Sequence, residues 1–78
     1  MALTLQQAHE ELRHKTIRAI QEDTAVTWCH RAIAAASMGN DEDAKEYGHE
    51  AIEHAALSGS DQLLRWVRRT CAEAGIGL

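Results

Sequence analysis

Two short motifs in the sequence share the spacing Glu-x-x-His, namely Glu11 with His14 and Glu46 with His49. On a helix, residues three apart share a face, and di-iron carboxylate bundles bind metal through two such motifs. A complete site also needs an inward-facing Glu from each of two further helices, and the two helices that remain offer only Glu73. We therefore favour a solvated Glu/His face, and keep a metal site completed at a dimer interface as the alternative hypothesis.

The segment from His49 to His54 resembles the zinc-protease motif but has the wrong spacing. Zinc proteases place their two histidines four residues apart, whereas these two are five apart. That spacing separates the two side chains by about 140° around a helix, so they cannot bind one metal ion. We predict instead that His49 pairs with Glu53, and Glu50 with His54, as i,i+4 contacts that support a helix.

The two cysteines, Cys29 and Cys71, are 42 residues apart and form no C-x-x-C motif. We expect reduced thiols that act as small buried hydrophobes, and a structural disulfide is the less favoured alternative. A nucleophile formed by Cys29 and His30 would lack both a third, orienting residue and an oxyanion loop. We therefore expect no catalytic residue, no cofactor and no enzymatic activity.

Charge varies along the chain, whose formal net charge is −4. Residues 41–53 hold six acidic residues against Lys45, a local charge of −5, whereas residues 54–78 have a local charge of +1. The arginines of the second region share one helix stripe, which is either a solvated face or a clip for the carboxylates of a partner protein or of another copy. The predicted partner-binding residues are Arg65, Arg68, Arg69, Trp66, Glu46 and Glu50.

Several classes of partner are disfavoured by the sequence. The chain has no broad basic patch that could neutralise several phosphates, so we expect no nucleic-acid partner. No apolar run approaches the roughly 20 residues of a membrane span, and the first residues carry no basic leader. We expect a cytoplasmic protein that binds another protein and forms a homo-oligomer. We expect no membrane partner.

The elements that position these residues are predicted to be helices. The chain has 14 Ala, two Val and no Pro, a composition that favours helices over strands. With Gly39, Gly59 and Gly75 as stop signals, we predict a single all-α domain of four helices, at about 4–20, 25–38, 42–57 and 61–74. The apolar period lapses at 21–24, where we place a break. A single helix over 4–38 is the alternative, because no Gly or Pro forces that break.

Small residues recur at steps of three and four in the second and third predicted helices, so that each helix carries them on one face. The two stripes are Ala25, Trp28, Ala32, Ala35 and Gly39 on one helix, and Ala44, Gly48, Ala51 and Ala55 on the next. Facing stripes of small side chains let two helix axes approach toward the lower end of the usual separation of about 8–10 Å. We therefore predict a closely packed antiparallel hairpin.

This hairpin, residues 25–56, resembles a single tetratricopeptide repeat. The positions that agree with the family pattern are Trp28, Ala32, Gly39, Ala44 and Ala51. The positions that depart from it are Arg31, Ala35, Gly48 and Ala56, which replace the Leu, Tyr, Phe and Pro of the family. The resemblance implies a lone helical hairpin with flanking helices as caps, in a scaffold that binds peptides of other proteins.

Gly48 stands where such a repeat carries a large aromatic side chain, which predicts a gap on the second helix of the hairpin. Tyr47 is turned about 100° away from that gap by helix geometry. We therefore expect Trp66 to fold back from the last helix and fill it. The alternative is that Trp66 projects beside the arginines as an interface anchor.

These features together predict a small interaction module. A chain of 78 residues, rich in Ala, is too short to build both a core and a substrate pocket. The separation of an acidic helix from a basic one favours association. We expect a non-enzymatic protein–protein interaction module, either an adaptor or an inhibitor that caps a larger complex, and we expect it to self-associate.

Overall fold

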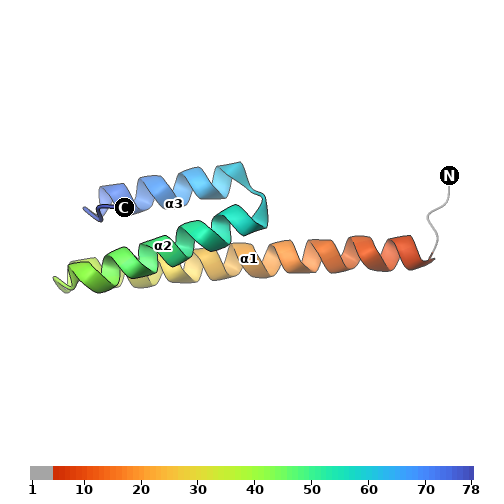
Figure 1. Cartoon of the computed structure of the whole chain (residues 1–78), viewed down its shortest axis with the longest axis horizontal. Coiled ribbons are helices and arrows are strands. Elements are labelled where there is room, and N and C mark those ends of the chain that lie inside the picture. Colours follow the sequence, from red (N-terminus) through yellow and green to blue (C-terminus); the bar gives the residue numbers. More distant parts are fainter. Residues whose placement is uncertain (1–4) are drawn as a thin grey trace.

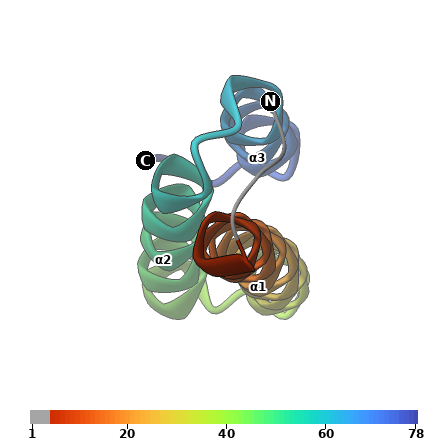
Figure 2. The ribbon, with the colours of Figure 1, turned by 90° about the vertical axis from the view of Figure 1, so that its right-hand side faces the viewer.

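The computed structural model describes the backbone of residues 5–78 and the side chains of residues 17–78, and this part of the chain folds into three α-helices without a strand. Helix α1 spans Leu5–Ser37, α2 spans Asp41–Ser58 and α3 spans Asp61–Glu73. In Figures 1 and 2, α1 and α2 lie side by side and antiparallel, and α3 packs against both. The all-α prediction is confirmed, and α2 and α3 begin and end within one residue of their predicted bounds.

The predicted break at residues 21–24 is wrong, because α1 runs through it as one helix. Two threonine hydroxyl groups near the expected break donate hydrogen bonds to carbonyl groups of the same helix, and neither caps the start of a new helix. Thr24 Oγ1 donates to the carbonyl of Ile20 at 2.7 Å, and Thr27 Oγ1 donates to the carbonyl of Asp23 at 2.9 Å. Such back-bonding to the residue four before keeps Thr compatible with a continuous helix. Three helices therefore replace the four predicted, and the alternative of one long first helix is correct.

The helix ends follow the predicted glycine signals. Gly39 and Gly75 have φ angles of +78°, the left-handed conformation that favours glycine. Next to them, Asn40 N–H donates to the carbonyl of Ala35 and Ile76 N–H to that of Cys71, both at 2.9 Å. These five-residue spans are the signature of the Schellman motif, which ends a helix and turns the chain sharply.

The contact between α1 and α2 is a seam of small side chains. Its buried members come from both predicted stripes: Ala25, Ala32, Ala35, Ala44, Ala51 and Ala55. Gly48 is also buried, but it faces α3 and the tail. The largest side chains that are fully buried anywhere in the described part are Val67, Cys29 and Cys71. A seam of Ala lets two helix backbones pack closely, but it removes little apolar area from water. The thin core and the antiparallel hairpin (Figure 1) are thus both confirmed.

The space beside Gly48 is filled differently from the prediction. A Cβ atom added to Gly48 would lie 2.9 Å from Leu78 Cδ2 and 3.6 Å from Cys71 Sγ, and Trp66 is not among its nearest neighbours. The tail brings Leu78 there because Gly75 reverses the chain, and Ile76 is buried in the core. The expectation that Trp66 fills this gap is therefore wrong. The tail after α3 does so instead.

The three helices form an elongated body measuring 55 × 16 × 12 Å along its principal axes. Helix α2 packs on the C-terminal part of α1, since His54, one turn before the end of α2, contacts Gln21. Helix α1 continues past the loop between α2 and α3, as Figure 1 shows. The α1–α2 turn and the tail after α3 therefore lie together at the opposite end of the molecule.

Candidate interaction surface

Helix α3 presents Trp66 and two of the predicted arginines around one hollow. Arg65 and Arg69 are exposed, and Trp66 is half-buried between them and the core. With Asp61 and Gln62, these three residues line a hollow of about 490 Å³, which we call the Trp66 hollow. Trp66 thus packs on the core and also borders the open surface, although it does not fill the gap at Gly48, and its role as an interface anchor stays a prediction.

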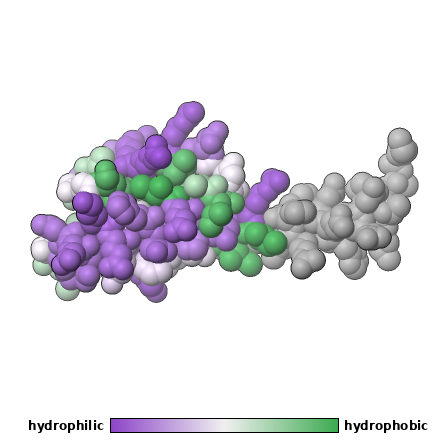
Figure 3. Space-filling view, viewed as in Figure 1, coloured by the Kyte–Doolittle hydropathy of each residue, from purple (hydrophilic) through white to green (hydrophobic). Residues whose placement is uncertain are grey.

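The third predicted arginine, Arg68, lies on another side of α3. It lines a groove of about 570 Å³ between α2, α3 and the tail, which we call the Arg68 groove; the other lining residues are His49, Ile52, Ala72, Ile76 and Leu78. Four of these six residues are apolar, and the two that are polar carry an imidazole and a guanidinium group. Figure 3 shows apolar surface gathered along the junction of α2 and α3. The predicted stripe of three arginines therefore divides into two separate surfaces.

The two acidic residues predicted to bind a partner differ in their exposure and in their contacts with other side chains. Glu46 is exposed on α2, and Glu50, which is half-buried, lies 3.7 Å from His54 Nε2. Within residues 17–78 this is the single pairing of a basic with an acidic side chain, and it is an ion pair only when His54 is protonated. The arginines of α3 and the other carboxylates of α2 have no oppositely charged partner in that part of the chain. These charges are therefore available to a second molecule.

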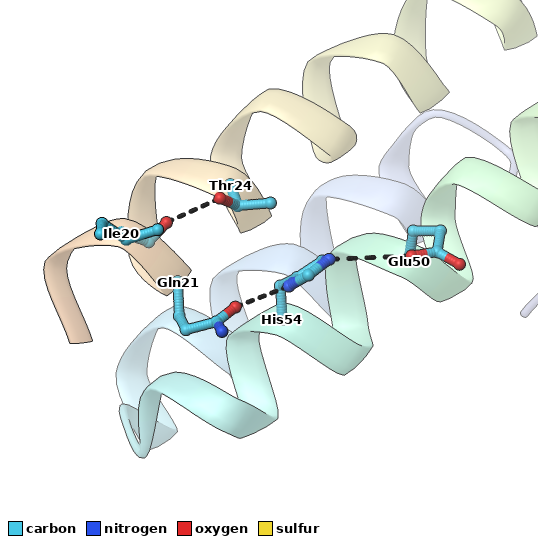
Figure 4. A network of polar contacts seen from close by, with 5 residues as sticks. All are labelled: Ile20, Gln21, Thr24, Glu50 and His54. Atoms are coloured by element: carbon cyan, nitrogen blue, oxygen red, sulfur yellow. Dashed lines mark hydrogen bonds and ion pairs between the residues drawn. The ribbon is translucent and has the colours of Figure 1, made fainter. Parts of the chain in front are cut away.

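His54 connects α1 to α2 at the point where the two helices diverge. Its Nδ1 atom lies 2.6 Å from Gln21 Oε1, and its Nε2 atom faces Glu50 (Figure 4). With its proton on Nδ1, the ring donates a hydrogen bond to the amide oxygen across the helix pair. The predicted pair of Glu50 with His54 is confirmed and lies within α2, whereas the contact of His54 with Gln21 links α2 to α1. No ion pair between His49 and Glu53 occurs among the described residues.

An aromatic cluster on the other part of the hairpin was not predicted from the sequence. The rings of Trp28 and Tyr47 join α1 to α2 with centroids 5.5 Å apart, and the guanidinium carbon of Arg31 lies 5.0 Å from the Trp28 ring centroid. The signal was the pair Trp28 and Arg31, three residues apart and so on one helix face. A guanidinium over an indole face is favourable by about 0.5–1 kcal/mol at exposed sites.

A few large apolar side chains are exposed, and sequence reasoning missed them as well. Ile17, Ile20, Met38 and Leu57 have exposed fractions of 49%, 57%, 82% and 62%. Met38 is the most exposed and lies in the turn between α1 and α2. Its position between Ala35 and Gly39 was the available signal, because Met38 falls outside the small-residue stripe that those two belong to. Figure 3 shows a further apolar patch beside the part drawn in grey.

The two cysteines are buried as free thiols, as predicted, with neither side chain open to water. Burial, with the neighbouring Cys71 thiol as a smaller cause, raises the pKa of Cys29 to about 11. Burial also raises the pKa of Cys71, and a hydrogen bond with Cys29 opposes that effect. The thiolate is the reactive form of cysteine, so both thiols stay protonated and unreactive near neutral pH.

The alternative metal site is only partly within the described residues. Glu46 and His49 are both exposed on α2, and the side chains of Glu11 and His14 lie outside the described part. Among side chains 17–78, no group of three or more His, Cys, Asp or Glu residues is placed to hold a metal ion. The metal hypothesis therefore stays a prediction from the sequence.

Within the described residues, no helix has the combination of length and apolar character needed to cross a membrane. Searches with family models, against curated proteins and against solved structures find no match to this chain. The small-residue hairpin is present in the structure, with Ala32, Ala44 and Ala51 buried in it. Its kinship with the tetratricopeptide repeat stays an interpretation of the sequence.

Proposed function

We propose that this chain is a small non-enzymatic protein–protein interaction module, an adaptor or a cap of a larger complex, which associates with copies of itself. The acidic face of α2 in one copy meets the basic face of α3 in another. One observation carries this proposal: the net formal charge is −5 on α2 and +1 on α3, and within residues 17–78 no Lys or Arg pairs with an Asp or Glu. A second copy supplies the missing partner for both faces.

Charge alone does not make such an interface stable, because an exposed ion pair contributes about 0–1 kcal/mol. Charge complementarity instead sets the orientation of the partners and the rate of encounter. Apolar surface must supply the rest. Trp66 in its hollow and the apolar floor of the Arg68 groove offer that surface next to the arginines. Tryptophan and arginine are the residues most enriched among the energetic anchors of protein interfaces.

Sedimentation equilibrium at micromolar concentration tests the proposal. We expect a dimer or larger oligomer at low ionic strength. We expect weaker association at about 1 M salt, where the screening length falls to about 3 Å. The variant Arg65→Glu/Arg69→Glu should sediment as a monomer. Its matched control, Arg18→Glu/Arg31→Glu, also reverses two exposed arginines but leaves α3 untouched, and it should associate like the natural protein.

A protein that sediments as a monomer under every condition contradicts self-association. A heterologous partner is then tested by affinity capture from the native host. The wild-type chain serves as bait beside the Arg65→Glu/Arg69→Glu variant. An interaction module should retain a partner that the variant loses, and a bait that retains none contradicts the proposed function. Metal analysis of the purified dimer distinguishes the alternative, since stoichiometric iron or zinc would favour a metal-binding protein.

A further inference from the structure

The turn between α1 and α2 carries an unusual combination of side chains. Met38 is 82% exposed, the highest value among the large apolar residues in the described part. Asp41 and Glu42 follow it on the exposed first turn of α2, and the Asn40 amide donates to Asp43 Oδ2 at 2.8 Å, which orders the turn. We call Met38, Asp41 and Glu42 the turn knob. A flexible, polarizable methionine beside carboxylates is suited to entering an apolar groove with a basic rim.

The Arg68 groove has the complementary chemistry. Its floor is made of Ile52, Ala72, Ile76 and Leu78, and its polar residues are Arg68 and His49. Arg68 has no carboxylate partner within residues 17–78. The groove volume of about 570 Å³ exceeds what one methionine fills, which leaves room for the carboxylates that follow it in the chain. An apolar side chain followed by acidic residues therefore fits this groove both in shape and in charge.

The turn knob lies at the same end of the molecule as the tail, which lines one side of the Arg68 groove. Asp41 lines a small hollow together with Gly75, Ile76 and Gly77 of the tail, so the turn and the tail are neighbours. Figure 1 shows the α1–α2 turn and the C-terminal tail at one end of the long axis. When complementary patches lie close together on one chain, a single two-fold axis satisfies both at once, and the assembly closes at two copies.

We infer that the Arg68 groove of one copy binds the turn knob of a second copy, reciprocally, in a two-fold dimer. Met38 enters the apolar floor between Ile52 and Ala72, and Asp41 or Glu42 pairs with Arg68. This inference rests on the proposed self-association and adds to it a defined contact. It also separates the roles of the arginines: Arg68 lies within the contact, and Arg65 and Arg69 beside the Trp66 hollow add longer-range attraction to the acidic α2 of the second copy.

Sedimentation equilibrium of two matched variants tests the contact. Met38→Ser should raise the dimer dissociation constant at least tenfold. Leu57→Ser removes an exposed aliphatic side chain from the other end of α2, and it should leave the constant within twofold of the wild-type value. Both residues are exposed, so both variants should keep the helical circular dichroism of the wild type. Equal effects of the two substitutions would overturn the inference.

Cross-linking locates the contact directly. Protein carrying Met38→Cys is mixed with protein carrying Ala72→Cys and treated with a mild thiol oxidant, which accepts the two electrons released as the S–S bond forms. We expect a covalent dimer whose proteolytic fragments join position 38 to position 72. A mixture of Leu57→Cys with Ala72→Cys should give no such link. The native cysteines are buried and do not compete.

The outcomes distinguish this inference from the proposed function. A wild-type dimer that is unaffected by Met38→Ser and forms no link between positions 38 and 72 overturns the knob-in-groove contact and leaves self-association intact. A wild-type chain that stays monomeric at all concentrations overturns self-association itself. Loss of association in Met38→Ser but not in Leu57→Ser, together with the specific cross-link, supports the contact.

Discussion

The two helix contacts of this protein are built in opposite ways. Between α1 and α2, the buried side chains are almost all Ala, and the larger Trp28 and Tyr47 pack beside them and stay partly exposed. Helix α3 is anchored by the buried Val67 and Cys71, while Leu63, Leu64 and Trp66 are covered only in part. The layer formed by α3 and the tail leaves apolar surface beside unpaired charge, which is what an interface needs.

The largest expected effect comes from breaking the seam. Ala51→Leu adds three heavy atoms where α1 and α2 touch, and overpacking of a core costs about 1–3 kcal/mol. Ala34→Leu adds the same atoms on the exposed side of α1 and should change the free energy of unfolding by less than about 0.5 kcal/mol. Chemical denaturation followed by circular dichroism measures both values. Equal tolerance of the two variants would contradict the close packing of the hairpin.

The contrasting substitution is Trp66→Ala, which lies where α3 packs on the hairpin. Burial of a tryptophan is worth about 3–5 kcal/mol when complete, and Trp66 is half-buried, so Trp66→Ala should cost about 1.5–2.5 kcal/mol. The same variant should also lose binding through the Trp66 hollow. Binding is measured well below the melting temperature of the variant, so that a loss of binding is not caused by unfolding. A melting temperature equal to that of the wild type would mean that Trp66 serves binding alone.

The pH dependence of the free energy of unfolding tests how completely the Cys29 thiol is buried. Burial raises the pKa of Cys29 from 9.0 to about 11, so as pH rises the unfolded chain loses this proton before the folded chain does. Stability should therefore fall between about pH 9 and pH 11, by the order of 1 kcal/mol. Urea unfolding at about pH 8 and pH 10 measures the slope. Cys29→Ala should flatten it, and an unchanged slope would show that other groups cause it.

The smallest expected effect concerns the polar contact that supports the seam. Glu50→Gln removes the charge that faces His54, and an exposed pair of this kind contributes less than about 0.5 kcal/mol. His54→Ala also removes the hydrogen bond to Gln21 and should cost about 0.5–1.5 kcal/mol. The comparison is made by denaturation near neutral pH. If Glu50→Gln costs as much as His54→Ala, the carboxylate and not the amide holds the ring.

The parts of the fold that depend on local spacing were predictable. Gly39, Gly59 and Gly75 marked the helix ends, and the repeat of Ala at steps of three and four gave the seam, because both signals act within a few residues. The break at 21–24 was wrong for a local reason. Asp23 and Thr24 have the residue types of an N-cap, but the Thr24 hydroxyl bonds within the helix instead.

The parts that depend on distant segments were not predictable. Nothing in the spacing of Leu78 and Gly48 indicates that a tail beyond a glycine turn covers the gap on α2. Of the candidate interaction residues, the arginines are exposed as expected, but their division into two surfaces follows from how α3 lies on α2. The complementarity of the Arg68 groove and the exposed Met38 can be recognised only from the three-dimensional positions of the tail and the α1–α2 turn.

The central claim is that the acidic face of α2 and the basic face of α3 in separate copies bind each other. A mixture of charge-reversed variants tests it most directly. Asp41→Lys/Glu42→Lys/Glu46→Lys changes the formal charge of residues 41–53 from −5 to +1, so that both faces are basic, and Arg65→Glu/Arg68→Glu/Arg69→Glu makes both faces acidic. Each variant alone should sediment as a monomer, and an equimolar mixture should form a heterodimer that dissociates at high salt. A mixture that stays monomeric, while the wild type dimerises, would contradict the claim.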